Sequence, residues 1–218
     1  MKALVGIKSC WRYTDRREAC RNTWLPDCPF EWNFFVGGHK PRKPFGSTTE
    51  QLYGESDVVS NPHPDDFKTI GPKIARMCEW ASRESADFLV VMDDDTYMRP
   101  QRAWQLMDRL KEVGGHVAAY MRVDPTYPQG SFYILRPKAY EILASHPLLD
   151  VVSAPDDVLV GRILSGYRGI VWHHSPEIQV GPRWKEGYPT AQNQIVSTHK
   201  CLPGDMKLVH ALWRASNG

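Results

Sequence analysis

The sequence lacks several features that would each indicate a particular class of protein. No apolar run reaches the roughly 18 residues that a membrane-spanning helix needs, so no transmembrane segment is predicted. The five cysteines include no CxxC pair, which disfavours a zinc site and a dense disulfide framework and predicts free thiols. The net charge is only +2 and the 27 basic residues are dispersed, so nucleic acid is not an expected partner.

The composition is that of a globular domain. With 42% hydrophobic and 24% charged residues, 218 residues are enough for one domain with a full-sized core. Apolar segments alternate with helical ones, which predicts an α/β fold with a parallel or mixed sheet flanked by helices. The expected strands span residues 3–7, 32–36, 88–92, 117–121, 131–135 and 170–173; the expected helices span 16–24, about 72–81 and 101–113; residues 39–46 and 182–194 are expected to form loops.

Two of the expected helices have a recognisable apolar face. Pro72 can begin a helix, because its missing N–H costs nothing at that position. Apolar residues then follow at i, i+3, i+4 and i+7, namely Ile74, Met77, Cys78 and Ala81. In the helix at 101–113 the apolar stripe consists of Trp104, Met107 and Leu110.

Three adjacent aspartates, Asp93, Asp94 and Asp95, follow an unbroken apolar run at residues 88–92. Such a run is typical of a central strand, and α/β sheets bind ligands beyond the carboxyl ends of their strands. Adjacent carboxylates repel each other unless a cation neutralises them, and their oxygens suit Mg²⁺ or Mn²⁺ bridged to phosphate. A solvated acidic turn is one alternative. A phosphatase-like DxDx(T/V) motif is another, disfavoured because Thr96 falls one place too early.

Several motifs resemble, in the same order, those of the β1,3-glycosyltransferases of family 31, which include galactosyl- and N-acetylglucosaminyltransferases and the Fringe enzymes. Residues 16–24 (RREACRNTW) resemble RRxAIRxTW, 34–37 (FFVG) resemble FLLG, and 65–73 (DDFKTIGPK) resemble DSYxNLTLK. Later segments resemble GGGYVLS, EDVxxG and HxxxPxEM; these are residues 130–135 (GSFYIL), 156–161 (DDVLVG) and 199–206 (HKCLPGDM).

The resemblance implies a GT-A fold, a UDP-sugar donor, a divalent ion (Mn²⁺ or Mg²⁺) and inversion at the anomeric carbon. It implies a single catalytic domain, residues 1–218, with a nucleotide-binding half at about 1–100 and an acceptor-binding half at about 101–218. The implied reaction moves galactose, N-acetylglucosamine or a related hexose to a glycan or glycoconjugate, with a β1,3 linkage. A non-catalytic UDP-sugar or glycan-binding module and a retaining GT-A enzyme of another family are the alternatives.

The expected location follows from two absences. Animal members of the family carry an N-terminal membrane anchor and disulfides, whereas here Met1 leads directly into a strand-like segment without a signal peptide. We therefore expect a cytoplasmic protein of bacterial or viral origin, unless the chain is a truncated Golgi-luminal enzyme.

By the resemblance, Asp95 and Asp93 bind the metal together with His199, and Asp93 and Asp94 contact the donor. His173 and His174, which follow a predicted strand, are competing ligands, and His210 is less favoured.

Three basic residues are expected at the donor. Arg17 and Arg21 lie one helical turn apart, so both can face a diphosphate, although surface solubility would also explain them. Lys73 lies near a helix start, where the helix dipole disfavours a cation, and this indicates a nearby anion.

Catalysis by inversion needs a carboxylate that accepts the proton of the acceptor hydroxyl. In the matched motif this residue is Asp157, with Asp156 as its neighbour. A structural role is the alternative, because Ser153 can cap a helix that begins near Pro155, and acids are favoured in a first turn.

Acceptor contacts are expected from aromatic residues. Tyr133 and Trp184 are the candidates, and Tyr188 and Trp172 could extend a sugar-stacking surface, although Trp172 could equally be buried. Ser131 occupies the place of a glycine in the family motif and adds bulk there, and Gly71-Pro72 reshapes one wall.

Overall fold

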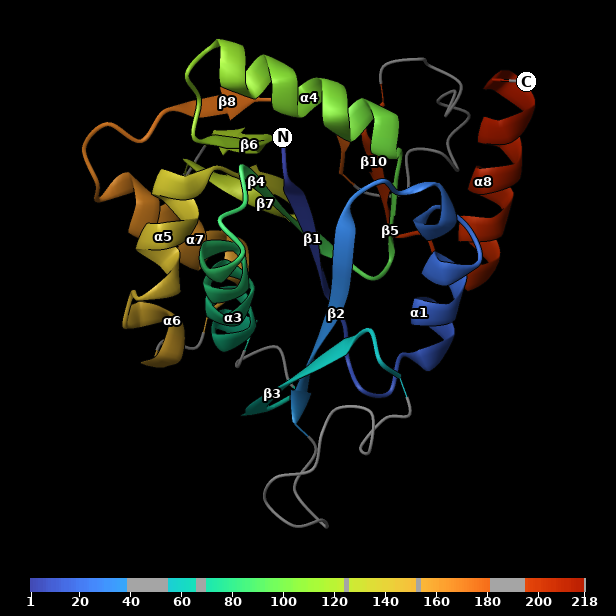
Figure 1. Ribbon diagram of the computed structural model, residues 1–218, viewed down its shortest axis with the longest axis horizontal. Coiled ribbons are helices and arrows are strands. Elements are labelled where there is room, and N and C mark those ends of the chain that lie inside the picture. Colours follow the sequence, from blue (N-terminus) through green and yellow to red (C-terminus); the bar gives the residue numbers. More distant parts are fainter. Residues whose placement is uncertain (39–54, 66–69, 124–125, 152–153, 181–194, 218) are drawn as a thin grey trace.

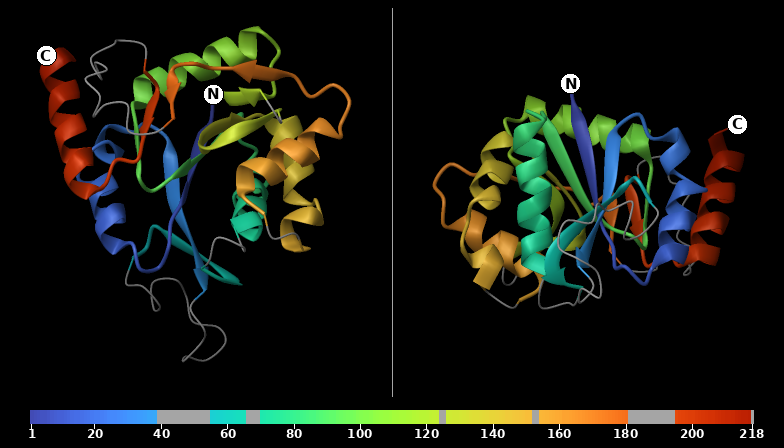
Figure 2. Two further views of the ribbon diagram at one scale, coloured as in Figure 1. Left: turned by 180° about the vertical axis from the view of Figure 1, so that it is seen from behind. Right: turned by 60° about the horizontal axis from the view of Figure 1, so that its bottom comes forward.

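A mixed seven-stranded sheet forms the centre of the molecule, with helices on both of its faces (Figures 1 and 2). The computed structural model describes residues 1–38, 55–65, 70–123, 126–151, 154–180 and 195–217. The strand order is β3-β2-β1-β4-β7-β6-β8. The strands are β1 (Ala3–Lys8), β2 (Glu31–Gly38), β3 (Val58–Pro64), β4 (Phe88–Asp93), β6 (Val117–Val123), β7 (Thr126–Leu135) and β8 (Trp172–His174).

The direction of the strands sets the position of the site. The first four strands in this order are parallel, and β7 runs antiparallel to both β4 and β6. The last residue of β1, Lys8, therefore pairs with the last residue of β4, Asp93, and the pairing of β7 with β4 begins next to them, at Phe132 opposite Met92. A smaller sheet stands next to this edge and consists of β5 (Thr96–Met98), β10 (Ser197–His199) and β9 (Ile178–Gln179).

The helices divide between the two faces of the large sheet, as Figure 1 shows. One face is covered by α1 (Thr14–Arg21), the 3-10 helix η1 (Leu25–Asp27), α4 (Pro100–Glu112) and α8 (Pro203–Asn217). The other is covered by α3 (Ile70–Arg83), α5 (Pro137–Ala144), α6 (Leu148–Val151) and α7 (Asp156–Ser165).

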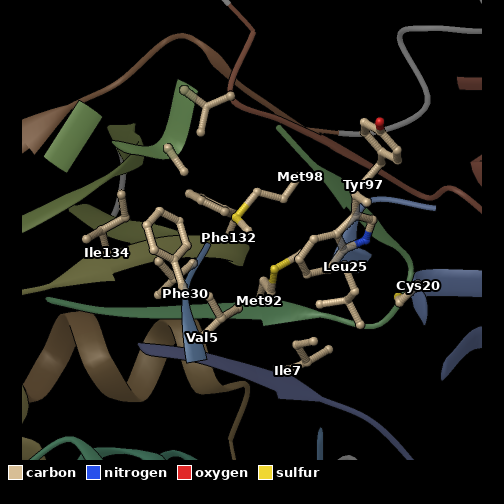
Figure 3. Packing of buried hydrophobic residues seen from close by; sticks show 14 of the residues in the cluster. Val5, Ile7, Cys20, Leu25, Phe30, Met92, Tyr97, Met98, Phe132 and Ile134 are labelled. Carbon is tan, nitrogen blue, oxygen red and sulfur yellow. The ribbon is translucent and has the colours of Figure 1, made fainter. Parts of the chain in front are cut away.

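Successive residues of the central strands point to opposite faces, and both faces are buried. Val5 and Ile7 pack into the core on the α1 side, and Leu4 packs into the core on the α3 side. Figure 3 shows the first of these cores, to which β1 contributes Val5, β4 contributes Met92 and β7 contributes Phe132. Because both faces are covered, these strands have the unbroken apolar sequences noted above.

The predicted α/β class with a mostly parallel sheet is confirmed, and each of the six predicted strands is present with shifted ends. The helix predicted at 16–24 is α1 and ends at Arg21, and the helix predicted to begin at Pro72 already includes Ile70. The loops predicted at 39–46 and 182–194 lie outside the described residues.

Some elements were not predicted. The sequence of β3 contains Pro62 and Pro64, which argue against a central strand; β3 is an edge strand, where proline is tolerated. The short strands β5, β9 and β10 and helix α8 also escaped the periodicity analysis.

The predicted apolar stripe of α4 needs a correction. Trp104 is 36% exposed and stacks on Phe30, while Ala103 and Leu106 enter the core beside Met107 and Leu110. The helix is therefore rotated slightly from the orientation that Trp104 suggested.

None of the five cysteines forms a disulfide bond, as predicted. In the part of the chain that the structure describes, no helix is long and apolar enough to cross a membrane.

Candidate functional site

A cavity of about 420 Å³ opens beyond the carboxyl ends of β1 and β4. Its lining comes from the end of β1 and the segment after it, from α1, from the residue that follows β3 and from the start of α3. The end of β4 with the two residues after it, the middle of β7, the start of α7 and the end of β10 complete the lining. The cavity therefore lies where an open α/β sheet places its ligand.

Asp93, Asp95 and His199 converge on one point of this cavity. Nε2 of His199 lies 3.3 Å from Oδ1 of Asp95 and 3.7 Å from Oδ2 of Asp93. Each residue offers one ligand atom, and the three atoms lie within 4.8 Å of one another, so the group could hold a metal ion. Carboxylate and imidazole ligands of this kind suit a divalent ion.

His199 reaches this point through the small sheet. Strand β10 pairs antiparallel with β5, so that His199 stands opposite Thr96, the residue after Asp95. Lys200 then adopts a left-handed conformation with φ of 60°, and the N–H of Cys201 donates to the carbonyl oxygen of Asp95 at 2.8 Å. Backbone hydrogen bonds thus hold His199 near Asp95, although the two residues are far apart in the sequence.

The charge of the cavity also favours a cation. Three cations, Lys8, Arg16 and Lys73, face a larger number of carboxylates. The carboxylates are the six of Asp65, Asp93, Asp94, Asp95, Asp156 and Asp157. With His199 neutral, three negative charges remain without a compensating cation among these lining residues, and a divalent ion at Asp93, Asp95 and His199 would reduce their repulsion.

Lys8 is buried at the centre of the acidic group. Its Nζ lies 2.8 Å from Oδ1 of Asp93 and 2.7 Å from Oδ2 of Asp156, and it donates to the carbonyl oxygen of Gly130 at 2.7 Å. Burial lowers the pKa of Lys8, but Asp156 and Asp93 outweigh this effect and raise the pKa above its ordinary value. Lys8 therefore stays charged and neutralises Asp156.

Asp94 is turned inward. Its Oδ2 accepts a hydrogen bond from the hydroxyl of Ser9 at 2.7 Å, and its Oδ1 lies 3.1 Å from Nη1 of Arg16. Burial raises the pKa of Asp94 to about 6, although Ser9 and Arg16 counteract the shift. The same Arg16 nitrogen lies 3.5 Å from Asp95, and its guanidinium carbon lies 4.0 Å from the ring centre of Tyr13, which also lines the cavity.

The start of α7 supplies Asp156 and Asp157 to the opposite side of the cavity. Gly130 permits this close approach: a Cβ at Gly130 would lie 3.1 Å from Oδ1 of Asp156 and 3.3 Å from Cβ of Asp157. Burial and the charge of Asp156 raise the pKa of Asp157, against hydrogen bonds from Val158 and Gly130. Both acids occupy the first turn of α7, as expected if they had a structural role, and both also line the cavity. Ser153, the expected cap of this helix, lies outside the described residues.

Lys73 lines the cavity from α3. It forms an ion pair with Asp65 and donates to the carbonyl oxygen of Ser9 at 2.6 Å. Asp65 also accepts a hydrogen bond from the N–H of Trp11 at 2.6 Å. These contacts connect the end of β3 and the start of α3 to the segment that follows β1. The anion predicted from the position of Lys73 is, in this structure, the carboxylate of Asp65.

Two of the expected donor residues are not among the cavity lining. The guanidinium of Arg17 is 1% exposed and pairs with Glu55 at 2.7 Å, and Arg21 pairs with Glu55 and with Asp57 at 2.7 Å. The structure brings Arg16 to the cavity instead. We therefore do not retain Arg17 and Arg21 as donor contacts.

The expected acceptor residues lie elsewhere or outside the described part. Tyr133 is fully buried and absent from the cavity lining, and its hydroxyl donates to Asp156 over 3.5 Å. We do not retain it as an acceptor contact. Trp184 and Tyr188 fall outside the described residues, and Trp172 is half-buried against the α3-side core.

The competing histidines do not join the candidate metal group. His173 and His174 belong to β8 at the far edge of the large sheet, and Nδ1 of His174 accepts a hydrogen bond from the N–H of Met121. His210 lies 2.9 Å from the hydroxyl of Tyr97.

Among the charged lining residues, sequence reasoning missed three as site residues: Lys8, Arg16 and Asp65. Lys8 gave one usable signal, since it is a lysine at the end of an apolar strand. Nothing local distinguished Arg16 from Arg17.

Comparison with known proteins gives partial matches. No protein-family model matches this chain. It is 27% identical over 116 residues to "Probable beta-1,3-galactosyltransferase 12" of Arabidopsis thaliana, which covers 48% of this chain and 31% of that protein. It is 25% identical over 130 residues to "Probable beta-1,3-galactosyltransferase 13" of the same plant, covering 54% of this chain and 37% of that protein. The matches thus span 31% and 37% of the two relatives, which is about a third of each.

One solved structure shares this architecture. The crystal structure of S. aureus TarS 1-349 in complex with UDP aligns with a TM-score of 0.50 at 12% identity, over 80% of this chain and 58% of TarS. A glycosyltransferase involved in glycosylation of the major capsid of PBCV-1 aligns with a TM-score of 0.48 at 10% identity, over 95% of this chain and 100% of that chain. The likeness to TarS shows the fold, the GT-A type of α/β fold that the sequence predicted.

Proposed function

We propose that this chain is a metal-dependent glycosyltransferase that moves a hexose from a UDP-sugar to a hydroxyl group of a glycan or glycoconjugate. The observation that carries the proposal is the convergence of Asp93, Asp95 and His199 in the same cavity as Asp157. The names of the two plant relatives support galactose as the transferred sugar and a β1,3 linkage, and the UDP in TarS agrees with a UDP-sugar donor. N-acetylglucosamine is the second candidate sugar.

In this proposal residues 1–100 mainly bind the donor and residues 101–218 mainly bind the acceptor. Asp93, Asp95 and His199 would hold Mn²⁺ or Mg²⁺, and the bound ion would stabilise the negative charge that develops on the departing diphosphate. Arg16, held beside Asp95, adds a second positive charge on the donor side. Tyr13 is 40% exposed and offers a flat face for the nucleobase.

Asp157 serves as the general base. Within the described residues no cation lies at ion-pair distance from Asp157, whereas Asp156 is bound to Lys8. Asp157 accepts the proton of the acceptor hydroxyl while that oxygen forms a bond to the anomeric carbon. The bond from this carbon to the diphosphate oxygen breaks, and its electron pair leaves with UDP. Attack from the side opposite the diphosphate inverts the anomeric configuration.

The test is release of UDP. The protein is incubated with UDP-galactose, UDP-N-acetylglucosamine and UDP-glucose, each with a panel of acceptors, with Mn²⁺ or with EDTA. We expect UDP release with at least one donor and its loss in EDTA. Equal release with and without metal would remove the metal from the proposal, and no release with any donor would overturn the enzymatic function. Analysis of the product by NMR determines the anomeric configuration and the linkage.

A further inference from the structure

Ser131, in β7, has a buried hydroxyl group that the rest of the site leaves unused. The residue is 2% exposed and lines the cavity, and its Oγ has no hydrogen-bond partner among the described residues. A buried hydroxyl without a partner costs free energy, and native proteins usually satisfy such groups with protein, water or a ligand. The hydroxyl is therefore available to a ligand group in the cavity.

The neighbours of Ser131 identify the part of the ligand it would meet. On one side is Gly130, above which Asp157 approaches to within 3.3 Å of an added Cβ. Thr96, which follows Asp95, donates its hydroxyl to the carbonyl oxygen of Ser131 at 3.2 Å. Ser131 is thus next in the chain to a residue that Asp157 approaches, and its backbone contacts the residue that follows Asp95.

The transferred sugar has to lie between the candidate metal group and the candidate base, because its anomeric carbon exchanges a bond to the diphosphate for a bond to the acceptor. We propose that the Ser131 hydroxyl forms a hydrogen bond with a polar substituent of the transferred sugar and thereby contributes to the choice of donor. This proposal rests on the function proposed above. Rotation about χ1 moves only the hydroxyl of a serine, so the group turns toward the sugar without a change in the backbone.

Specificity follows from the buried position. A site that pairs a buried polar group with one substrate substituent disfavours a sugar that lacks the substituent, since the group is then left unpaired. The sequence motif that Gly130-Ser131 resembles has glycine in place of Ser131, and glycine cannot make this contact. Ser131 therefore distinguishes the donor choice of this chain from that of a site lined by backbone alone.

Ser197 in β10 is a matched control. It is 1% exposed, and its Oγ likewise has no partner within the described ranges, but it is not among the residues that line the cavity. Ser131→Ala and Ser197→Ala each remove one buried, unpaired hydroxyl. Only the first is expected to change sugar binding.

The experiment compares the affinities of UDP and of UDP-galactose, UDP-N-acetylglucosamine and UDP-glucose, measured by calorimetry with Mn²⁺. We expect Ser131→Ala to bind UDP like the wild type and to bind the preferred UDP-sugar about fivefold more weakly, the effect of one neutral hydrogen bond. Ser131→Gly should behave in the same way, and Ser197→Ala should match the wild type with every ligand. Thermal unfolding checks that all variants are folded.

The outcomes separate the two proposals. If the wild type binds a UDP-sugar and Ser131→Ala keeps the same ratio of UDP-sugar to UDP affinity, the role of Ser131 is overturned and the proposed function stands. An equal loss in Ser131→Ala and Ser197→Ala would likewise overturn it, because the effect would then be one of folding. If the wild type binds no UDP-sugar, both proposals fail.

Discussion

Lys8 and Asp156 lie 148 positions apart in the chain and form a buried ion pair, with 2.7 Å between Nζ and Oδ2. The same ammonium group contacts Asp93 and the carbonyl of Gly130, so all three of its N–H donors are used. One side chain thereby connects the ends of β1 and β4 with β7 and α7. Lys8 thus connects Asp93 of the candidate metal group with Asp156, the neighbour of the candidate base.

Replacing Lys8 by Met should destabilise the protein strongly. The buried carboxylate of Asp156 and the partly exposed carboxylate of Asp93 would lose their cation, and breaking a buried pair such as Lys8–Asp156 costs about 3–5 kcal/mol. Urea unfolding in EDTA measures the change. The double variant Lys8→Met/Asp156→Asn should recover part of the loss, since one of the uncompensated charges is removed; a double variant less stable than Lys8→Met would contradict this account.

His199→Ala should abolish the stabilisation of the protein by Mn²⁺. An ion that binds only the folded state raises the melting temperature, and the variant lacks the imidazole that stands 3.3 Å from Asp95. His173→Ala is the matched control, because His173 lies on β8 away from the group. A shift with Mn²⁺ that His173→Ala loses and His199→Ala retains would place the metal elsewhere.

Substitutions of Arg16 and Arg17 should affect different properties, namely UDP binding for Arg16 and stability for Arg17. Arg16→Ala is expected to weaken UDP binding about tenfold, because it removes a cation that lines the cavity. Arg17→Ala is expected to lower the melting temperature, since it removes a buried guanidinium that pairs with Glu55 and donates to the carbonyl oxygen of Cys10, while UDP affinity stays unchanged. Calorimetry and thermal unfolding of both variants test this, and a larger loss of UDP affinity in Arg17→Ala would reverse the assignment.

Asp157→Asn should lower kcat by about 10² to 10⁴ with little change in UDP affinity, because the amide cannot accept the acceptor proton. Transfer rates and UDP binding are measured on the same preparations. An unchanged kcat would remove Asp157 from the mechanism, and the chain would then fit a UDP-sugar-binding module or a base at another position.

The rate should depend on pH through Asp157. Burial and Asp156 raise the pKa of Asp157, and only the deprotonated carboxylate accepts a proton. The value of kcat/KM is therefore full above the raised pKa and falls as the pH drops through it, at a pH above the value of about 3.9 for an ordinary aspartate. Mn²⁺ binding measured at each pH distinguishes this effect from loss of the metal. An acid limb at or below the ordinary value would contradict the assignment.

The hydrophobic pattern predicted those features of the structure that depend on a few consecutive residues. The run at 88–92 predicted a buried strand, and the position of Asp93 and Asp95 at its end predicted their place at the edge of the sheet. The strand β3 was missed because edge pairing overrides the usual meaning of its prolines. Trp104 was assigned to the core because periodicity cannot distinguish a buried ring from one that stacks on a surface neighbour.

The choice between neighbouring residues needed the tertiary structure. Arg16 and Arg17 are adjacent and identical in chemistry, and only the rotation of α1 against Glu55 and Asp94 decides which of them reaches the cavity. Asp156 and Asp157 likewise differ in charge compensation, because Lys8 pairs with Asp156 and leaves Asp157 as the candidate base.

By itself, the sequence determined the α/β class and the position of the three aspartates, because strand periodicity and the end of an apolar run are properties of consecutive residues. The tertiary structure brought His199, which the resemblance already favoured over His173, next to Asp93 and Asp95, and it decided that Lys8 lies among the acids. The physical reason is distance along the chain: these contacts join strands and helices whose pairing depends on how the whole core packs, and no local pattern records that packing.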